Sequence, residues 1–365
     1  MQAKTKKTSL KKNSATQVDL INKIESAALV GRGGASFPVA SKWRAVEQAL
    51  KSKKEAYIVV NGAEGEPGLK KDGFILEKHT EDFIFGLNLA FEFLGKDKVK
   101  KIYLFLNKTY IKISGAKIKK VLADKKYSDL EKKVEFFSKP LDAGYIGGEE
   151  SSILNIIEGK KAEPRIRPPF PTTSGLFSKP TLINNVETFL DVALVFREDY
   201  RGDRFYTISG AVKKPGVYRF PALMPIESVL KQSANYPNFD FFVQIGGNAS
   251  GEILNKEQIN IPADSAASIM VYDRNKTDEK KLIEYWLKFY FNNSCGQCLT
   301  CREGTYRLYE MIRAKTYDQK IFWDIVSTLD DSSFCALGSS LPIPLLSYYR
   351  NIKGIELINL HEENN

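Results

Sequence analysis

The sequence has little histidine and little cysteine, with two and four residues respectively in a chain of 365. It also lacks any Ser, Cys or His pattern that would activate a side chain as a nucleophile, which argues against a covalent catalytic intermediate. Three of the four cysteines crowd into positions 295–301, so they do not form the dispersed framework of a secreted disulfide protein. These scarcities predict a protein of the reducing cytoplasm.

Long apolar runs are missing as well. The longest apolar region, DFIFGLNLAFEFLG at 82–95, is too short to span a membrane and contains Asp82 and Glu92. The first fifteen residues, MQAKTKKTSLKKNSA, are basic but no apolar stretch follows them, which disfavours a secretory signal. We therefore expect no direct membrane insertion and a cytoplasmic location.

Positive charge is in excess, with a net charge of +10 that comes largely from lysine. The lysine runs at 51–54, 96–101 and 117–120 are spread along the chain, and no recognisable nucleic-acid-binding motif accompanies them. Such runs are typical of solvated faces, or of a surface that docks an acidic protein partner. We expect no nucleic-acid ligand, although charge alone leaves open a basic nucleic-acid-binding module with structural zinc.

The order of hydrophobic patterns predicts several parts. Apolar residues at helical spacing predict a helix over 18–30, and YIVVNG (57–62) and KIYLFLN (101–107) read as buried strands on either side of a helix at 82–95. This β-helix-β order predicts an α/β layer with parallel strands. From about residue 204, short strand patterns flank a Lys-Lys-Pro-Gly turn at 213–216, and from 278 the pattern becomes helical. We expect a basic tail (1–17), an α/β domain (18–203), a small β-rich module (204–277) and a helical domain (278–365).

The most specific chemical signal is the segment SCGQCLTCREG. Cys295, Cys298 and Cys301 have the spacing C-x2-C-x2-C, which lets three thiolates converge on three corners of an iron–sulfur cluster. A fourth ligand must come from elsewhere, and Cys335 in SSFCALG is the one cysteine left. Structural zinc, which more often takes two separated pairs of ligands, and inert buried cysteines remain alternatives. The spacing favours a [4Fe-4S] cluster.

A glycine-rich segment, GRGGASFP at 31–38, nearly fits the dinucleotide fingerprint G-x-G-x-x-G, with Ser36 in the last glycine position. A helix-like segment precedes it where a strand would be required, so the fingerprint alone is weak. Its backbone amides could still approach a phosphate, with Arg32 and Lys42 as countercharges.

Two further glycine-rich loops carry carboxylates. NGAEGEPG (61–68) contains Glu64 and Glu66, and GYIGGEES (144–151) contains Glu149 and Glu150. Carboxylates are poor phosphate ligands, but they accept hydrogen bonds from the hydroxyls of a ribityl or ribose chain and from the amides of a flavin or nicotinamide ring. Each loop by itself could also be a solvated turn.

These motifs together carry a family resemblance. GRGGASFPVASKW, NGAEGEPG, AGYIGGEESSILNIIEGKKAEPRIRPPFP, GLFSKPTLINNVET, SCGQCLTCREG and SSFCALG occur in this order. From about residue 18 to 350 the chain resembles the flavin-containing, NADH-oxidising F-type subunit of respiratory complex I, which is related to the diaphorase subunits of NAD-linked hydrogenases and formate dehydrogenases. The resemblance implies an α/β flavin-binding domain, a β-grasp (SLBB-like) middle module and a C-terminal helical bundle that carries the cluster.

The resemblance also implies cofactors and site residues. Hydride would pass from NADH to FMN, single electrons would then pass to the [4Fe-4S] cluster on Cys295, Cys298, Cys301 and Cys335, and on to a partner subunit with iron–sulfur centres, often a [2Fe-2S] thioredoxin-like protein. No side chain would be catalytic in itself, but Glu66 and Glu150 would lie near the nicotinamide. Positions that match FMN-binding residues are Gly31, Arg32, Gly33, Gly34, Lys42, Asn61, Glu64, Glu66, Tyr145, Gly148, Glu149, Glu150, Asn184, Asn185 and Thr188. Positions that match NADH contacts are Phe37, Arg167 and Phe170.

Two departures from the family pattern concern the nucleotide site. The usual Asn-Ala-Asp-Glu is replaced by Asn-Gly-Ala-Glu at 61–64, a form that resembles the NADH-side subunit of Rnf-type oxidoreductases, so Ala63 removes one carboxylate beside the flavin. Ser36 replaces a glycine at the entrance of the site. A degenerate electron-relay or assembly subunit, which keeps the cluster but binds nucleotide poorly, is the alternative that these departures leave open.

Overall fold

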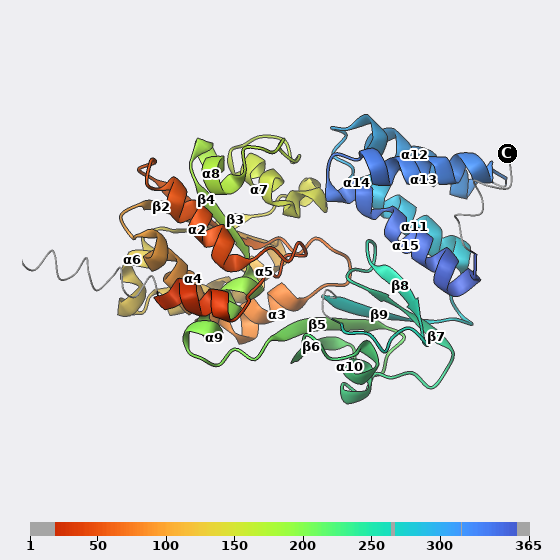
Figure 1. Cartoon of the computed structure of the whole chain (residues 1–365), viewed down its shortest axis with the longest axis horizontal. Helices are drawn as coiled ribbons and strands as arrows, with labels where there is room; N and C mark the ends of the chain where they lie inside the picture. The colour runs from red at the N-terminus through yellow and green to blue at the C-terminus, as the bar shows by residue number, and fades with distance from the viewer. Residues whose placement is uncertain (1–18, 264–266, 315, 356–365) are drawn as a thin grey trace, which may run out of the picture.

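The computed structural model describes residues 19–263, 267–314 and 316–355. Figure 1 shows three parts: an α/β part on the left, a β-rich part at the lower right, and the C-terminal helices above it. The basic tail predicted at 1–17 lies outside the described residues.

The α/β part is built on a four-stranded sheet. Its strands are β1 (Ala56–Gly62), β2 (Val99–Leu106), β3 (Val134–Ser138) and β4 (Thr181–Asn185). They lie in the order β3-β2-β1-β4, and every pair is parallel, as the β-helix-β pattern predicted. All four strands therefore end at the same edge of the sheet, where Asn61 of β1 pairs with Asn185 of β4.

Helices cover both faces of this sheet. Residues 19–26 are helical, and the helices that follow are α2 (Val39–Ala49), α3 (Lys71–Lys78), α4 (Thr80–Leu94), α5 (Lys108–Leu122), α6 (Ser128–Glu131), α7 (Glu150–Ile157), α8 (Pro171–Ser174) and α9 (Val186–Phe196). Short 3-10 turns occur at Lys125–Tyr127, Leu141–Ala143, Ile146–Gly148 and Leu176–Ser178. Successive residues of β1 point to opposite faces. Ile58 joins the core formed with α2, α4 and α9, and Val59 joins a smaller core that includes α7.

Two helices, not the one that the sequence predicted, connect β1 to β2. They are α3 and α4, which meet at His79. Helix α4 packs closely on α9, since a Cβ at Gly86 would lie 1.8 Å from the carbonyl oxygen of Phe189. Glycine at this position is required by that approach.

The β-rich part is a mixed five-stranded sheet in the order β6-β5-β9-β7-β8. Its elements are β5 (Asp203–Gly210), β6 (Gly216–Pro221), helix α10 (Ile226–Gln232), β7 (Phe241–Ile245), β8 (Glu252–Asn255) and β9 (Ser268–Asp273). β5 and β6 form the antiparallel hairpin expected around the Lys-Lys-Pro-Gly turn, while β5 and β9 are parallel.

The C-terminal helices are α11 (Glu279–Asn293), α12 (Leu299–Arg313), α13 (Gln319–Ser332), α14 (Ala336–Ser340) and α15 (Pro342–Tyr348), followed by a π-helical turn at Tyr349–Lys353. They share one core with the second sheet: the hydroxyl of Ser347 on α15 accepts a 2.9 Å hydrogen bond from the amide of Ile253 on β8. Within the described part of the chain, no helix combines the length and the apolarity that crossing a membrane requires.

Candidate functional site

One cavity of about 480 Å³ lies where the three parts of the chain meet. A parallel sheet commonly binds its ligand beyond the carboxyl ends of its strands, and this cavity opens there. Its volume is within the range of about 300–1,000 Å³ that is usual for small-molecule and cofactor sites. Predicted site residues among those that line it are Arg32, Gly33, Gly34, Asn61, Glu64, Glu66, Tyr145, Gly148, Glu149 and Asn185. Leu337 and Ser340, close after Cys335, line it from the C-terminal helices.

The glycine-rich loop forms one wall of the cavity. An isolated bridge between Val30 and Pro38 closes the loop at its base, and the amide of Gly31 donates to the carbonyl of Phe37 at 2.9 Å. Gly34 has a φ of 107°, which side chains rarely adopt, and a Cβ there would meet nothing within 4 Å. The loop thus leaves open space beside exposed backbone, which fits the approach of a phosphate.

Arg32 does not have the role that the sequence predicted for its side chain. Its guanidinium bonds to Asp191 on α9 at 2.8 Å and to the Tyr200 hydroxyl at 2.7 Å, and its side chain is 3% exposed. The backbone amide of Arg32 donates to the Thr188 hydroxyl at 3.0 Å. Arg32 and Thr188 therefore anchor the glycine-rich loop to α9, and the guanidinium is not available as a phosphate countercharge.

Charged residues next to Glu149, which lines the cavity, pair with one another, although Lys42, Glu150 and Arg167 are not themselves among the lining residues. Lys42 Nζ lies 3.0 Å from Glu150 Oε2 and 3.2 Å from the Ile183 carbonyl. Arg167 bonds to Glu149 and lies 3.6 Å from Glu150. Phe37, whose ring centre is 6.0 Å from Lys42 Nζ, is 51% exposed. The structure thus brings together the residues predicted to hold FMN and NADH on the 31–42 and 145–167 segments.

Phe170 is also strongly exposed, at 55%, although it is apolar. It precedes the short helix α8, which begins with Pro171. A solvent-exposed aromatic ring on a loop is available for stacking with a ligand, and the same holds for Phe37.

Glu149 combines two tasks. Its Oε2 atom accepts hydrogen bonds from the amides of Ser151 at 2.9 Å and Ser152 at 2.8 Å, so it caps the start of helix α7 while it lines the cavity. A carboxylate at this position is stabilised by the unpaired amides of the first turn and by the helix dipole. The Gly-Gly-Glu-Glu-Ser-Ser order is a capping signal that the sequence reasoning missed.

Asparagines tie the strand ends together. Asn61 donates to the Gly148 carbonyl at 3.0 Å and accepts from the Ala63 amide at 3.1 Å. Asn185 donates to the Asn61 carbonyl at 3.1 Å. Asn184, the neighbour of Asn185 on β4, points to the opposite face of the sheet. It accepts a hydrogen bond from the Trp43 indole of α2 at 3.2 Å and so fixes the end of β4 to α2.

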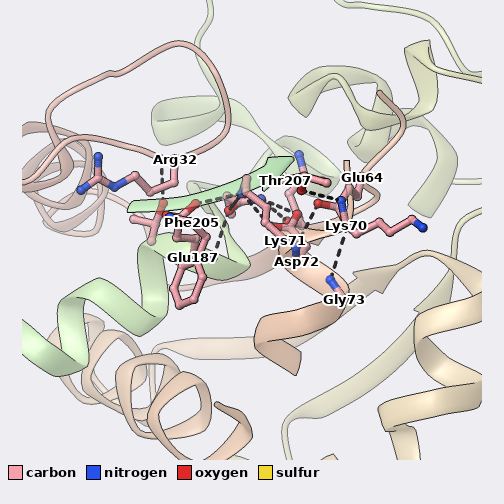
Figure 2. A network of polar contacts seen from close by, with 12 residues as sticks. Arg32, Glu64, Lys70, Lys71, Asp72, Gly73, Glu187, Phe205 and Thr207 are labelled. Atoms are coloured by element: carbon pink, nitrogen blue, oxygen red, sulfur yellow. Dashed lines mark hydrogen bonds and ion pairs between the residues drawn. The ribbon is translucent and has the colours of Figure 1, made fainter. Parts of the chain in front are cut away.

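A buried network of charges, which sequence reasoning did not identify, lies beside the cavity (Figure 2). Lys71 Nζ contacts Asp72 at 2.7 Å and Glu187 at 3.0 Å, and it donates to Asn185 at 3.0 Å. Burial by itself would lower the Lys71 pKa, because it disfavours the charged form. The negative charges of Asp72 and Glu187 have the larger combined effect, so the Lys71 pKa is raised. Glu187 also accepts from the amide of Phe205 on β5 at 3.1 Å, which joins the network to the second sheet. The only sequence signal was the Glu of the NNVET segment.

Glu66 connects the acidic loop to the second sheet. It accepts hydrogen bonds from the amides of Ala249 at 2.9 Å and Ser250 at 3.2 Å. Burial raises the pKa of Glu66 despite these donors. Gly247 is required below it, because a Cβ there would lie 2.3 Å from Glu66 Oε1.

The four cysteines converge near the cavity. Cys298 occupies the position before α12, Cys301 lies in its first turn, and Cys335 precedes α14. Burial, with lesser effects of the other three cysteines, raises the pKa of Cys301 to about 11. The amides of Leu337 and Gly338 donate to the Cys335 sulfur. Helix α14 closes on α12 because Gly338 has no side chain: a Cβ there would be 3.3 Å from the Cys301 Cβ.

The cysteine spacing, rather than the geometry of the side chains, favours a cluster over a single ion. Across residues 19–263, 267–314 and 316–355, no group of three His, Cys, Asp or Glu side chains is placed to hold one metal ion. A zinc site requires all ligands about 2–2.3 Å from one centre, whereas a [4Fe-4S] cluster spreads its four thiolates over the corners of a larger body.

A cofactor-sized cavity at the strand ends of a parallel sheet, close to four neighbouring cysteines of which three have iron–sulfur spacing, fits an electron-transfer protein with an organic cofactor and an iron–sulfur cluster. Comparison with known proteins agrees. Residues 24–194 match the family model for the Nuo51 FMN-binding domain, and residues 281–354 match the iron–sulfur binding region of NADH-ubiquinone oxidoreductase-F.

The chain belongs to the family of NADH-quinone oxidoreductase F subunits. It is 30% identical to the F subunit of Streptomyces coelicolor, over 91% of this chain and 81% of that protein, and 28% identical to the F subunit of Aquifex aeolicus, over 88% and 81%. A crystal structure of an NAD+-reducing [NiFe]-hydrogenase in the H2-reduced state superposes with a TM-score of 0.80 at 28% identity. That match covers 92% of this chain but 61% of the hydrogenase chain, so this chain spans less than two thirds of it.

The family assignment confirms the resemblance seen in the sequence, together with the class of enzyme and the two cofactors, FMN and a [4Fe-4S] cluster. The individual contacts of each predicted site residue with these cofactors stay predictions.

Proposed function

We propose that this chain is an NADH-oxidising electron-input module. NADH gives a hydride to FMN, and electrons then pass singly to the cluster on Cys295, Cys298, Cys301 and Cys335. The observation that carries the proposal is the single cavity bounded by the glycine-rich loop on one side and by Leu337, two residues after Cys335, on the other. In such a cavity the proposed substrate site lies next to the segment that carries Cys335, a proposed ligand of the cluster that accepts the electrons.

The residues of the cavity suit FMN. Gly33 and Gly34 would receive the phosphate with their backbone amides, and Asn61 and Asn185 at the strand ends would bond to the ribityl chain or ring. Lys42 supplies the cation at the rim that Arg32 does not. Bound FMN supplies the conversion from two-electron to one-electron transfer, and the protein supplies position and electrostatics.

NADH would bind at the rim beside the flavin. The exposed rings of Phe37 and Phe170 offer stacking surfaces for the adenine end, and Arg167 offers a cation. Glu66 and Glu150 would lie near the nicotinamide as hydrogen-bond acceptors. Glu150 and Glu149 are already paired with Lys42 and Arg167. Binding of NADH would therefore replace existing ion pairs and would not leave a charge without a partner.

The finer domain description and the partners follow from the same proposal. The sheet of β5 to β9 would be a β-grasp (SLBB-like) module spanning 204–277, between an FMN domain (18–203) and a helical-bundle domain (278–365). The relatives named above are subunits, which supports the existence of partner subunits. We propose that these partners carry iron–sulfur centres and include a [2Fe-2S] thioredoxin-like protein. The module would then be peripheral, on the cytoplasmic face of a membrane complex.

A second candidate is an electron relay that binds nucleotide poorly. It is favoured by Ala63, which is 1% exposed beside Gly148 and places no carboxylate where the family has one. Anaerobic reconstitution with iron, sulfide and FMN separates the candidates, with the visible spectrum recorded before and after NADH. Bleaching of the flavin band at NADH stoichiometry is the expected result. A cluster without flavin would support the relay, and zinc without iron would contradict both.

A further inference from the structure

The carboxylate of Glu64 is held in an unusual way for a group that lines the cavity. Its backbone has a φ of 35°, and its side chain accepts from the amides of Asp72 at 2.9 Å and Gly73 at 3.4 Å. The Tyr110 hydroxyl on α5 donates to Glu64 Oε2. Burial, with a further contribution from Asp72, raises the Glu64 pKa to about 7. The protonated and ionised forms of Glu64 are therefore both populated near neutral pH.

The contact with Tyr110 depends on a glycine. A Cβ at Gly73 would lie 2.4 Å from Cε1 of the Tyr110 ring, so a side chain at this position would displace the ring. Tyr110 is partly exposed, whereas Glu64 lines the cavity. The pair thus connects the interior of the site with the surface of α5.

Other cavity carboxylates are engaged differently. Glu66 accepts from two backbone amides and from the hydroxyls of Ser250 and Tyr145, which both line the cavity. Glu149 accepts from the hydroxyl of buried Ser151, caps α7 and pairs with Arg167. Asp72 bonds to Lys71 and Asn185 inside the protein. Among the described residues, Glu64 is the cavity carboxylate that bonds to the hydroxyl of a partly exposed residue outside the cavity lining.

We propose that Glu64 and Tyr110 form the proton exit of the site. The inference rests on the proposed function. Oxidation of one NADH to NAD+ releases two electrons and one proton; the electrons leave through the cluster, and the proton has to leave the cavity separately. Glu64 Oε2 takes up this proton, and the Tyr110 hydroxyl, which points at Glu64 in the structure, turns toward water. The proton then passes from Glu64 to the Tyr110 oxygen while the hydroxyl proton of Tyr110 goes to water. No bond other than these O–H bonds forms or breaks.

The groups around Glu64 set its response to pH. Lys71 and Asp72 on α3 face it with opposite charges, and Tyr110 faces it from α5. The Tyr110 hydroxyl stabilises the ionised carboxylate and thereby lowers the Glu64 pKa. Loss of the hydroxyl should leave a carboxyl that ionises only at higher pH.

The test is the variant Tyr110→Phe, which keeps the ring beside Gly73 and removes the hydroxyl. In the FMN-free protein, carboxyl infrared spectra, with the Glu64 band assigned through Glu64→Gln, should show the Glu64 titration moved upward by about half to one pH unit. In the reconstituted protein, the acid limb of the pH profile for NADH oxidation should move upward in the same way, and the solvent deuterium isotope effect should increase. Gly73→Ala, which displaces the ring, should reproduce both shifts.

Tyr103→Phe is the matched control, because it removes a hydroxyl from β2 in the same domain and should change neither titration nor profile. Superimposable pH profiles and isotope effects for wild type and Tyr110→Phe would overturn the inference. Cofactor contents distinguish this outcome from failure of the proposed function. If only the proton-exit inference is wrong, FMN and iron are bound and NADH bleaches the flavin. If the proposed function is wrong, NADH does not bleach the flavin. An unshifted carboxyl band in the FMN-free variant also counts against the inference.

Discussion

Lys42 on α2 and Glu150 at the first residue of α7 form an ion pair, with 3.0 Å between Nζ and Oε2, that joins the glycine-rich half of the site to the acidic half. The two side chains are 20% and 28% exposed, so the pair is partly shielded from water. In the proposed function, Lys42 serves the phosphate side of the site and Glu150 the nicotinamide side.

Glu150→Ala should weaken NADH binding. Loss of one hydrogen-bond acceptor and of the partner of Lys42 should raise the KM for NADH about five- to tenfold, equivalent to about 1–1.4 kcal/mol, with a smaller change in kcat. Steady-state kinetics with an artificial acceptor measure both constants. Glu227→Ala, which breaks an exposed pair with Lys231 on α10, is the control. Unchanged NADH oxidation by Glu150→Ala would remove Glu150 from the site.

Asp191→Ala should destabilise the protein and release the glycine-rich loop. Asp191 and Arg32 are 2% and 3% exposed in their side chains, so the variant leaves a buried guanidinium without its carboxylate. Such losses cost about 3–5 kcal/mol. Denaturant unfolding measures the cost, and FMN retention on gel filtration should fall because the loop is anchored through Arg32. Undiminished stability together with full FMN retention would contradict the anchoring role.

Much of the architecture could be predicted because its signals are local. The parallel layer followed from two apolar strand patterns around a helix, and the cysteine spacing predicted the iron–sulfur region that the family model matches, whereas its individual ligands stay a prediction. The residues that sequence reasoning missed or misassigned depend on distant partners instead. Arg32 meets Asp191 across 159 positions, and Glu66 meets Ala249 across 183. No local sequence pattern predicts such contacts, because an arginine or a glutamate can equally well bind a ligand or pair with a distant residue.

The stability of the FMN-free protein should depend on pH through Glu64. Its pKa of about 7 in the folded chain exceeds the ordinary value of 4.5, so the folded state binds this proton more tightly. The stabilisation that the folded state gains from binding the Glu64 proton is therefore fully present below about pH 4.5 and is lost as pH rises through 7. Glu64→Gln should remove this loss, of about 2–4 kcal/mol, and should gain stability relative to wild type between pH 5 and 8. Urea unfolding across this range tests the sign; a relative loss would contradict the burial argument.

Cys335→Ser should separate the two cofactors. Cys335 is the predicted cluster ligand that lies outside the C-x2-C-x2-C segment, and the amides of Leu337 and Gly338 hold its sulfur at the start of α14. Serine keeps the size of the side chain but binds iron far more weakly than a thiolate, so the cluster should be lost or depleted. FMN should remain, because the glycine-rich loop and the strand ends that line its proposed site belong to the α/β part.

Iron and sulfide content and electron paramagnetic resonance measure the cluster, and anaerobic titration with NADH measures the flavin. NADH should still bleach one flavin per chain in Cys335→Ser, whereas transfer to acceptors that depend on the cluster should fall at least tenfold. Ser332→Ala, which changes an exposed hydroxyl three positions earlier, is the matched control and should keep both cofactors. A full cluster in Cys335→Ser would mean that the fourth ligand is another group, and loss of flavin bleaching would mean that the cavity depends on the cluster for its shape.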